Sequence, residues 1–432
     1  MGRQGYEWVN HSMAPTRLPT HDFRVWIGGA PGQPSVSAQP CTQPYHASVF
    51  NISAMSFGAL SANAILALNQ GAKMGGFAHD TGEGSISAHH RVHGGDLIWE
   101  IGSGYFGCRH DDGSFSEERF VVNAVDPQVK LIELKMSQGA KPGHGGILPG
   151  PKVTAEIAAA RGVPVGQDCI SPASHGAFST PVEMMQFIAR LRTLSGGKPT
   201  GFKLCMGHPW EWFAIVKAML ETGITPDFIV VDGAGGGTGA APLEFSDHVG
   251  APLQEGLLLV HNTLVGVNLR SRVSIGAAGK VTSAFDIVRL MALGCIQAQT
   301  CHTGRCPTTQ DPLRQQALVV PSKTARVRNF HRSTLHALQE LVQAAGLCHP
   351  SDVHAHHIVR RLTDTEVRLL SNLILQVEPG ALLGDMTDQH NVFRLYWPMA
   401  SAHSFQASRP AVTASGPPLH AGGALEAVPT RV

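Results

Sequence analysis

Short apolar segments alternate with amphipathic ones in the central part of the chain, from about residue 49 to residue 294. Seven apolar runs end in small or polar residues, and we expect strands at 50–55, 76–80, 129–135, 163–168, 201–205, 228–232 and 273–277. Amphipathic segments with helical spacing lie between most of these runs, at 61–74, 181–194, 210–221, 254–267 and 283–293. Strands that alternate with helices form βα units, which build a parallel sheet.

The number of βα units favours a closed barrel over an open sheet. The turn after the first strand carries no dinucleotide-binding fingerprint, and seven strand candidates follow one another before residue 280. An eight-stranded barrel needs one more strand after the helix at 283–293, yet Cys295 follows almost at once. The sequence therefore predicts an α/β fold, a TIM-type (β/α)8 barrel that lacks or rearranges strand 8.

The regions outside the barrel have a different composition. Residues 1–48 are rich in Pro, Gly and Gln and predict an extended lead-in. The barrel and the cysteine segment that follows it occupy 49–320, and 321–402 has the pattern of a helical region. Residues 403–432 are rich in Ala, Ser, Pro and Gly without periodicity, which predicts a disordered tail.

Composition narrows the class of function. Of 432 residues, 33 are Lys or Arg and 32 are Asp or Glu, so the net charge of +1 gives no basic surface for nucleic acid or an anionic membrane. No run reaches the ~18–20 apolar residues of a membrane helix, and the first residues lack the apolar core of a secretion signal. Eight cysteines are too few for a disulfide scaffold, so a reduced, cytoplasmic setting is expected. The 48 glycines and the low charge are typical of an enzyme core that handles a ligand.

Three cysteines lie close together in the sequence, at Cys295, Cys301 and Cys306. Thiolates are soft ligands for iron–sulfur clusters or zinc, and a proline follows the third cysteine, as is common in cluster loops. Three thiolates suit a three-iron cluster better than a closed zinc site with four ligands. The alternative is three partly buried core cysteines. His302 is either a fourth ligand or an exposed loop residue.

Glycine-rich loops follow two consecutive strands. The segment Asp232–Gly239 and the segment Gly276–Gly279 both place successive backbone amides at a strand end, where they form a nest for phosphate. Two such loops near the end of a barrel match the usual phosphate position of this architecture. Each loop by itself is equally consistent with a tight turn.

Charged residues at strand ends are further candidates. Lys135, Gln138 and Lys141 follow one strand, where a lysine fixes a carboxylate or an electron-rich ring, or else belongs to a solvated loop. Glu83 lies in an Asp-Thr-Gly-Glu-Gly-Ser loop and is a candidate anchor for an amine, although most single carboxylates at such positions are structural. Lys203 lies within an apolar strand, where a buried ammonium is costly unless an anion meets it.

In order and in context, these segments resemble the flavin-binding synthase domain of glutamate synthase, in its stand-alone branch. The resemblance covers about residues 45–315. The matching segments are ISAMSFGALS (52–61), DTGEGS (80–85), IELKMSQGAKPGHGG (132–146), GFKLCMGH (201–208), DGAGGGTGAAP (232–242) and CIQAQTCHTGRCP (295–307).

The resemblance implies a barrel that holds FMN beside a 3Fe-4S cluster and reduces 2-iminoglutarate, formed from 2-oxoglutarate and ammonia, to L-glutamate. Electrons come from ferredoxin or an NAD(P)H-linked subunit, and ammonia from a separate glutaminase subunit. The implied catalytic residues are Glu83, Lys135, Gln138 and Lys203. The implied cofactor contacts are Ala54, Met55, Ser56, Thr81, Gly82, Lys141, Asp232, Gly236, Gly237, Gly276 and Gly279, and the implied cluster ligands are Cys295, Cys301 and Cys306.

The sequence departs from the family pattern in ways that affect function. It has no leading catalytic cysteine of a glutaminase, and His144 stands where large members have glutamate. Between the helix at 283–293 and Cys295 it lacks the family's eighth strand and phosphate-binding loop, so we expect weak binding of the FMN phosphate. Two alternatives stay open: an N-methylglutamate synthase-like enzyme with a separate glutaminase-type subunit, and a degenerate, non-catalytic homologue that binds FMN poorly.

Overall fold

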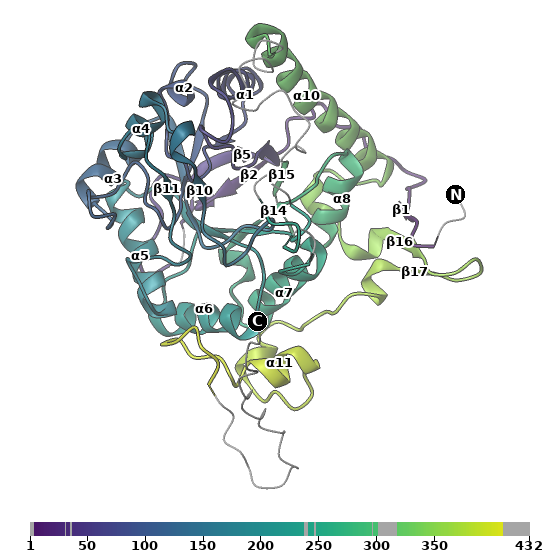
Figure 1. Ribbon diagram of the computed structural model, residues 1–432. Helices are drawn as coiled ribbons and strands as arrows, with labels where there is room; N and C mark the ends of the chain where they lie inside the picture. Colours follow the sequence, from purple (N-terminus) through teal and green to yellow (C-terminus); the bar gives the residue numbers. More distant parts are fainter. Residues whose placement is uncertain are drawn as a thin grey trace, which may run out of the picture.

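A closed barrel of eight parallel strands forms the centre of the computed structural model, which describes residues 4–408 except for 31, 35–36, 237–240, 246–247, 296 and 301–317 (Figure 1). Around the barrel the strands follow one another in chain order, so each βα unit lies beside the next. The strands are β6 (Phe50–Ile52), β7 (His79–Asp80), β8 (Leu97–Ile101), β9 (Val129–Lys135), β12 (Thr200–Leu204), β13 (Phe228–Asp232), β14 (Ser274–Ala278) and β15 (Gln297–Thr300). The α/β barrel class expected from the sequence is confirmed.

The helices expected from amphipathic spacing are present within one or two residues of their predicted bounds. They are α1 (Ala62–Gly75), α5 (Pro181–Leu194), α6 (Pro209–Thr222), α7 (Leu253–Gly266) and α8 (Ala284–Ala292), with the shorter α2 (Ala88–Arg91), α3 (Glu117–Ala124) and α4 (Ala155–Arg161) between earlier strands. Local signals fix their ends. In α5, Thr180 and Glu183 form a reciprocal capping box and Pro181 occupies the first turn.

One strand prediction is wrong, and two barrel strands, β8 and β15, were missed. Residues 163–168 form no strand, because Gly166 has a left-handed backbone and Val165 is 60% exposed, whereas a barrel strand is covered on both faces. The first missed strand is β8, whose five residues are all buried. Glu100 interrupts its apolar run, and its charge is accommodated inside the barrel, where Lys203 pairs with it.

Strand 8 is rearranged, and the prediction that no room is left for it is wrong. Strand β15 begins two residues after Cys295 and pairs with β14 on one side and β6 on the other. The chain reverses quickly because Gly294 adopts φ +103°, a conformation that favours glycine. The barrel therefore closes with a segment that the sequence had assigned to the cysteine loop.

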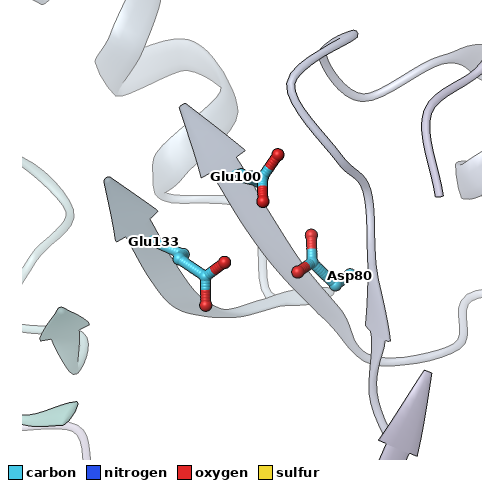
Figure 2. A group of neighbouring side chains, drawn as sticks. All are labelled: Asp80, Glu100 and Glu133. Carbon is cyan, nitrogen blue, oxygen red and sulfur yellow. The ribbon is translucent and has the colours of Figure 1, made fainter. Parts of the chain in front are cut away.

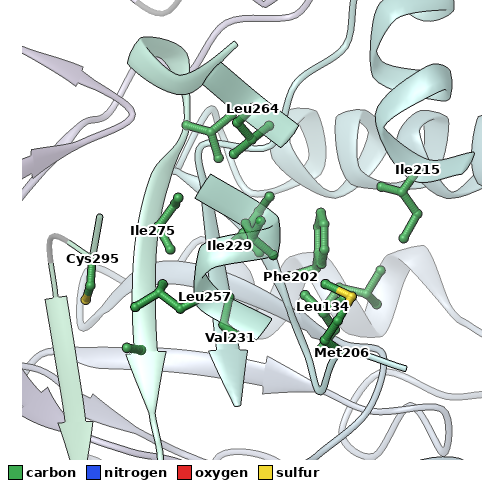
Figure 3. Close-up of a cluster of buried hydrophobic side chains, with 14 of the residues drawn as sticks. Leu134, Phe202, Met206, Ile215, Ile229, Val231, Leu257, Leu264, Ile275 and Cys295 are labelled. Carbon is green, nitrogen blue, oxygen red and sulfur yellow. The ribbon is translucent and has the colours of Figure 1, made fainter. Parts of the chain in front are cut away.

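The main hydrophobic core lies between the barrel and its ring of helices. Strand side chains that point outward meet the inner faces of α6 and α7 (Figure 3). The figure labels Leu134, Phe202, Ile229, Val231 and Ile275 from strands, Ile215, Leu257 and Leu264 from helices, and Met206 and Cys295 beside them. Alternate residues of each strand face the barrel interior instead.

The inward residues form an apolar layer and a polar layer. Ile98, Leu131 and Val230 belong to a small apolar cluster together with Ile27 and Ala47. The last two come from a hairpin of β2 (Arg24–Ile27) and β5 (Tyr45–Ser48), which therefore closes the amino-terminal end of the barrel. Two residues further along each strand, the inward positions carry charged side chains. The polar layer thus lies on the carboxyl-terminal side.

The regions after the barrel agree only in part with the helical expectation for 321–402. Helix α10 (Val320–Ala344) packs against α1 and α8. Next come β16 (Ile358–Arg361) and β17 (Val367–Leu369), which form a small sheet with β1 (Glu7–Val9) from the lead-in, and finally the short α11 (Asn391–Tyr396). The tail expected to be disordered lies outside the described residues from 409 onward. Among the described residues, no helix has the length and apolar character required to cross a membrane.

Replacing Gly294 by alanine is expected to lower the free energy of unfolding by about 2 kcal/mol or more. A Cβ at this position would approach Nδ1 of His261 to 2.2 Å, and this atom accepts a hydrogen bond from Arg270. Chemical denaturation measures the change. Gly176→Ala is the matched control, since a Cβ there meets nothing within 4 Å, and equal stability of the two variants would contradict the role of Gly294.

Candidate active site

Most of the residues singled out in the sequence lie at the carboxyl-terminal ends of the barrel strands. Ala54, Met55 and Ser56 follow β6; Thr81, Gly82 and Glu83 follow β7; Lys135 ends β9, and Gln138 and Lys141 follow it; Lys203 lies in β12; Asp232 ends β13, and Gly236 follows it; Gly279 follows β14. Gly276 differs, because it lies within β14. A Cβ at this position would lie 3.2 Å from Cγ2 of Val230. Gly237, Cys301 and Cys306 lie outside the described residues.

Lys135 is held at the centre of a small polar pocket. Its Nζ donates to Oε1 of Gln138 at 2.6 Å and lies 3.1 Å from Oε2 of Glu83. Lys141 and His144 line the same pocket, and the Lys141 ammonium reaches the carbonyl oxygen of Gly145 at 3.4 Å. These side chains, which the sequence singled out, thus lie together in one pocket, and their roles there stay a prediction.

The charges around this pocket are set by burial and by one another. Burial raises the pKa of Glu83, but Lys135, Arg161 and Lys141 lower it by more, so Glu83 is a carboxylate. Burial lowers the pKa of Lys141, and Lys135 adds to that effect while Glu83 opposes it. Two ammonium groups with one carboxylate leave the pocket with an excess of positive charge, which favours an anionic ligand.

Glycines allow the neighbouring loops to approach each other backbone to backbone. A Cβ at Gly139 would lie 1.9 Å from the carbonyl oxygen of Gly233, and a Cβ at Gly236 would lie 3.1 Å from that same oxygen and 3.8 Å from Cα of Gly279. Asp232 ties the loops together, since its Oδ2 accepts from the backbone amide of Gly139 at 3.1 Å. The loops after β13 and β14 thus present backbone, with little side-chain bulk, toward the mouth of the barrel.

Below the pocket, the polar layer of the barrel contains residues that the sequence reasoning did not assign. Lys203 donates to Oε2 of Glu100 at 2.7 Å, and both are buried. Asp80 and Glu133 complete a group of three carboxylates whose oxygens lie within 4.8 Å of one another (Figure 2). The signal that could have found Glu100 and Glu133 is the one that singled out Lys203: a charged residue inside an apolar strand.

His175 and Tyr105, which the sequence reasoning also missed, position the backbone of Lys135. His175 Nε2 lies 2.8 Å from the Lys135 carbonyl oxygen, and its Nδ1 lies 3.0 Å from the Tyr105 hydroxyl. Burial lowers the pKa of His175 to about 4, so the ring is neutral and donates to the carbonyl through Nε2. This contact fixes the end of β9, from which the Lys135 side chain emerges.

Cys295 is distant from this mouth along the strands. It precedes β15 at the amino-terminal end of the barrel and is 3% exposed, within the main hydrophobic core. Figure 3 shows its side chain beside the base of the sheet. The segment Gln297–Thr300 then runs through the barrel wall before the next cysteine in the sequence.

Comparisons with known proteins agree with this arrangement. A family model described as the conserved region in glutamate synthase matches residues 35–348. The glutamate synthase large subunit-like protein YerD of Bacillus subtilis is 39% identical over 361 residues, which are 79% of this chain and 68% of that protein. The archaeal-type glutamate synthase (NADPH) of Thermotoga neapolitana is 34% identical over 313 residues, 68% of this chain and 58% of that protein. The chain thus spans less than two thirds of the second relative.

Among solved structures, the likeness is weaker. A mandelate oxidase variant with (S)-mandelic acid aligns with a TM-score of 0.48 and 14% identity, covering 84% of this chain and 86% of that one. The family model covers well over half of the chain, and on that ground the chain belongs to the glutamate synthase family.

Proposed function

We propose that this chain is an FMN-dependent oxidoreductase of the glutamate synthase class, which converts 2-oxoglutarate and ammonia to L-glutamate through an imine. The observation that carries the proposal is the pocket built from Lys135, Lys141, Glu83 and Gln138 at the mouth of the barrel. Two buried or half-buried ammonium groups suit a substrate with two carboxylates, and Glu83 suits an ammonium or iminium nitrogen.

The loops around the pocket are compatible with FMN. Glycine backbones at Gly139, Gly233, Gly236 and Gly279 leave space that side chains would fill, and backbone amides there suit a phosphate group. FMN, when bound and reduced, supplies a hydride. The roles of Ala54, Met55 and Ser56 beside the flavin ring, and of Thr81, Gly82 and Asp232 as further contacts, belong to this proposal.

The residues of the chain would divide the remaining work. Lys135 binds a substrate carboxylate, and Gln138 and Glu83 hold the lysine in one orientation. Glu83 stabilises positive charge on the nitrogen after ammonia replaces the carbonyl oxygen and water leaves. A hydride at the iminium carbon then gives the neutral amine, and one proton at nitrogen gives the ammonium group of glutamate.

Further partners are needed for a complete cycle. We include an electron donor such as ferredoxin or an NAD(P)H-linked subunit, and a separate glutaminase-type subunit as a source of ammonia. With another amine in place of ammonia, the same pocket would serve an N-methylglutamate synthase-like reaction. The relatives named above include an enzyme whose name specifies NADPH, which supports a nicotinamide-linked donor.

We leave a 3Fe-4S cluster out of the proposed chemistry, because the one implied ligand that the structure describes lies far from the pocket. Cys295 is buried in the apolar core at the amino-terminal end of β15, whereas the flavin pocket lies at the opposite end of the strands. The other two implied ligands, Cys301 and Cys306, lie outside the described residues.

A second candidate is the degenerate homologue that binds FMN poorly. The observation that favours it is β15 itself, because this strand uses for barrel closure the residues that follow a phosphate loop in the family pattern.

Replacement of Lys135 by methionine is expected to lower glutamate formation at least about a hundredfold, because loss of a charged contact costs ~3 kcal/mol. The assay mixes photoreduced, FMN-loaded protein with 2-oxoglutarate and ammonia without oxygen, and follows flavin reoxidation and glutamate. The control is Lys152→Met, at an exposed position. Equal activity of both variants would contradict the proposal that Lys135 binds the substrate.

Titration with FMN and with riboflavin separates the two candidates. We expect FMN to bind at most about tenfold more tightly than riboflavin, ~1.4 kcal/mol, because the glycine loops after β13 and β14 offer backbone amides to the phosphate but the family's phosphate loop has no counterpart in this sequence. Near-visible absorbance or flavin fluorescence reports binding. A submicromolar FMN affinity with far weaker riboflavin binding would show an intact phosphate site, whereas no binding of either would favour the degenerate homologue.

Replacement of Cys295 by alanine is expected to leave the iron and sulfide content of the purified protein unchanged and to lower its stability by about 1 kcal/mol, through loss of core contacts. Elemental analysis and thermal unfolding measure the two effects. Cys348→Ala, at an exposed cysteine, is the control. Iron present in the control and lost in the Cys295 variant would make Cys295 a ligand after all.

A further inference from the structure

Five ionisable side chains share the polar layer of the barrel. Asp80 comes from β7, Glu100 from β8, Glu133 from β9, Lys203 from β12 and Asp232 from β13. Glu100 and Glu133 are direct cross-strand partners, and four of the five groups are buried, whereas Asp232 is half-buried. If all were ionised, four negative charges would face one positive charge in a dry interior, which is strongly unfavourable.

The carboxylate oxygens are poorly supplied with hydrogen-bond donors. Both side-chain oxygens of Glu133 and Oδ2 of Asp80 are buried and meet no protein donor. Carboxylate oxygens of Glu133, Asp80 and Glu100 lie within 4.8 Å of one another. Two carboxylate oxygens form a hydrogen bond only when one of them carries a proton, so a proton on this group satisfies several orphaned atoms at once.

We propose that Glu133 holds a proton that it shares with Asp80 and Glu100, which makes the barrel interior a proton-holding site directly beneath the substrate pocket. Figure 2 shows the three side chains converging from neighbouring strands. The shared proton lowers the charge of the layer and leaves Lys203 paired with ionised Glu100 at 2.7 Å.

The electrostatics of the layer agree with this geometry. Burial, with help from Glu100, raises the pKa of Asp80 to about 7. Burial and the neighbouring Asp80 raise the pKa of Glu133 well above its usual value. Burial would lower the pKa of Lys203, but the surrounding carboxylates, led by Glu100, raise it well above normal. Asp232 is the remaining charged neighbour. Burial raises its pKa, and the nearby Lys203 ammonium partly offsets that rise.

A proton suits this site better than a metal ion. The carboxylates are close enough to hold a cation, but the Lys203 ammonium already lies against Glu100 and would repel a divalent ion. Hard cations also need six or more oxygen ligands. The fixed ammonium makes a proton the smaller and better-matched occupant.

The position of the site gives the proton a use, and this step rests on the proposed function. Lys203 of the layer lies in register with Lys135 of the pocket on the adjacent strand, so the two residues are at the same height in the barrel. The Lys203 N–H bond would break as the product nitrogen gains its proton, while the hydride comes from reduced FMN. The O–H bond of Glu133 then breaks, and its proton passes through Glu100 to restore the ammonium. After the product leaves, a hydronium ion from the solvent gives a proton to Glu133 and becomes water, so that Lys203 is the donor to the product and Glu133 is the store.

Infrared spectroscopy of the full chain without added flavin tests the proton itself. At neutral pH, wild-type protein is expected to show a buried, protonated carboxyl stretch that shifts in heavy water. Glu133→Gln should lose it, Glu133→Asp should keep a shifted band, and Glu118→Gln, at an exposed carboxylate, should leave it unchanged. Absence of the band in the wild type, or a metal ion whose removal by chelator creates it, would overturn the proposal, whether or not the variants fold.

Stability against pH gives a second readout. Because the pKa of Asp80 is raised in the folded state, the folded chain binds more protons than the unfolded one between about pH 4 and pH 7. Wild-type stability is therefore expected to fall as the pH rises through 7. In Glu133→Gln, the amide N–H donates to Asp80 without a titrating proton, so the fall should become shallower. An identical slope in both proteins would contradict proton sharing.

Single-turnover kinetics test the use of the proton. With photoreduced, FMN-loaded protein, Glu133→Gln is expected to slow glutamate formation by about a hundredfold, the lower end of proton-transfer contributions, with unchanged affinity for 2-oxoglutarate. Unchanged rates with a normal infrared band would overturn the relay. If the wild type makes no glutamate but shows the band, the proposed function fails and the proton-holding site stands.

Discussion

Parallel strands form a barrel only when the last strand meets the first, and in this chain that contact is made by four residues. Strand β15 bridges β14 and β6, so that no edge is left with unpaired backbone groups. Every candidate site residue depends on this closure, because the loops converge on one mouth only if the wall beneath them is continuous. The turn at Gly294 allows the closure, since it brings the chain from α8 into the wall within a few residues.

Closure also decides what lies inside. A closed wall removes water, so charged side chains in the polar layer must satisfy one another. The Lys203–Glu100 pair is the clearest consequence. Glu133 meets this pair because it lies in register with Glu100, and Asp80 approaches from β7, where it is in register with Ile98. The rim differs, because the side chains of Lys135 and Glu83 remain partly accessible to solvent. Their mutual ion pair can therefore be replaced by contacts with a ligand.

Much of the fold and the rim could be predicted from the sequence, because both depend on local signals. Amphipathic spacing and caps located helices such as α5, and the residue types after β9 indicated the pocket around Lys135. What failed depended on distant partners. Strand β8 was missed because Glu100 looks polar until Lys203, about a hundred residues later, is placed beside it. Strand β15 was missed because its residues were assigned to the cysteine loop. Their role as a strand follows only from the unpaired edges of β14 and β6, which they join.

The hairpin of β2 and β5 gives the barrel only one open end. Ile27 and Ala47 close its base with apolar side chains, so the polar layer has no aqueous path in that direction. Any ion or water molecule that reaches Glu133 must pass the rim where the ligand binds. A bound ligand would therefore block proton exchange between the polar layer and the bulk solvent for as long as it stays. The number of protons in the layer would then be set by the pH of the solution at the moment of binding.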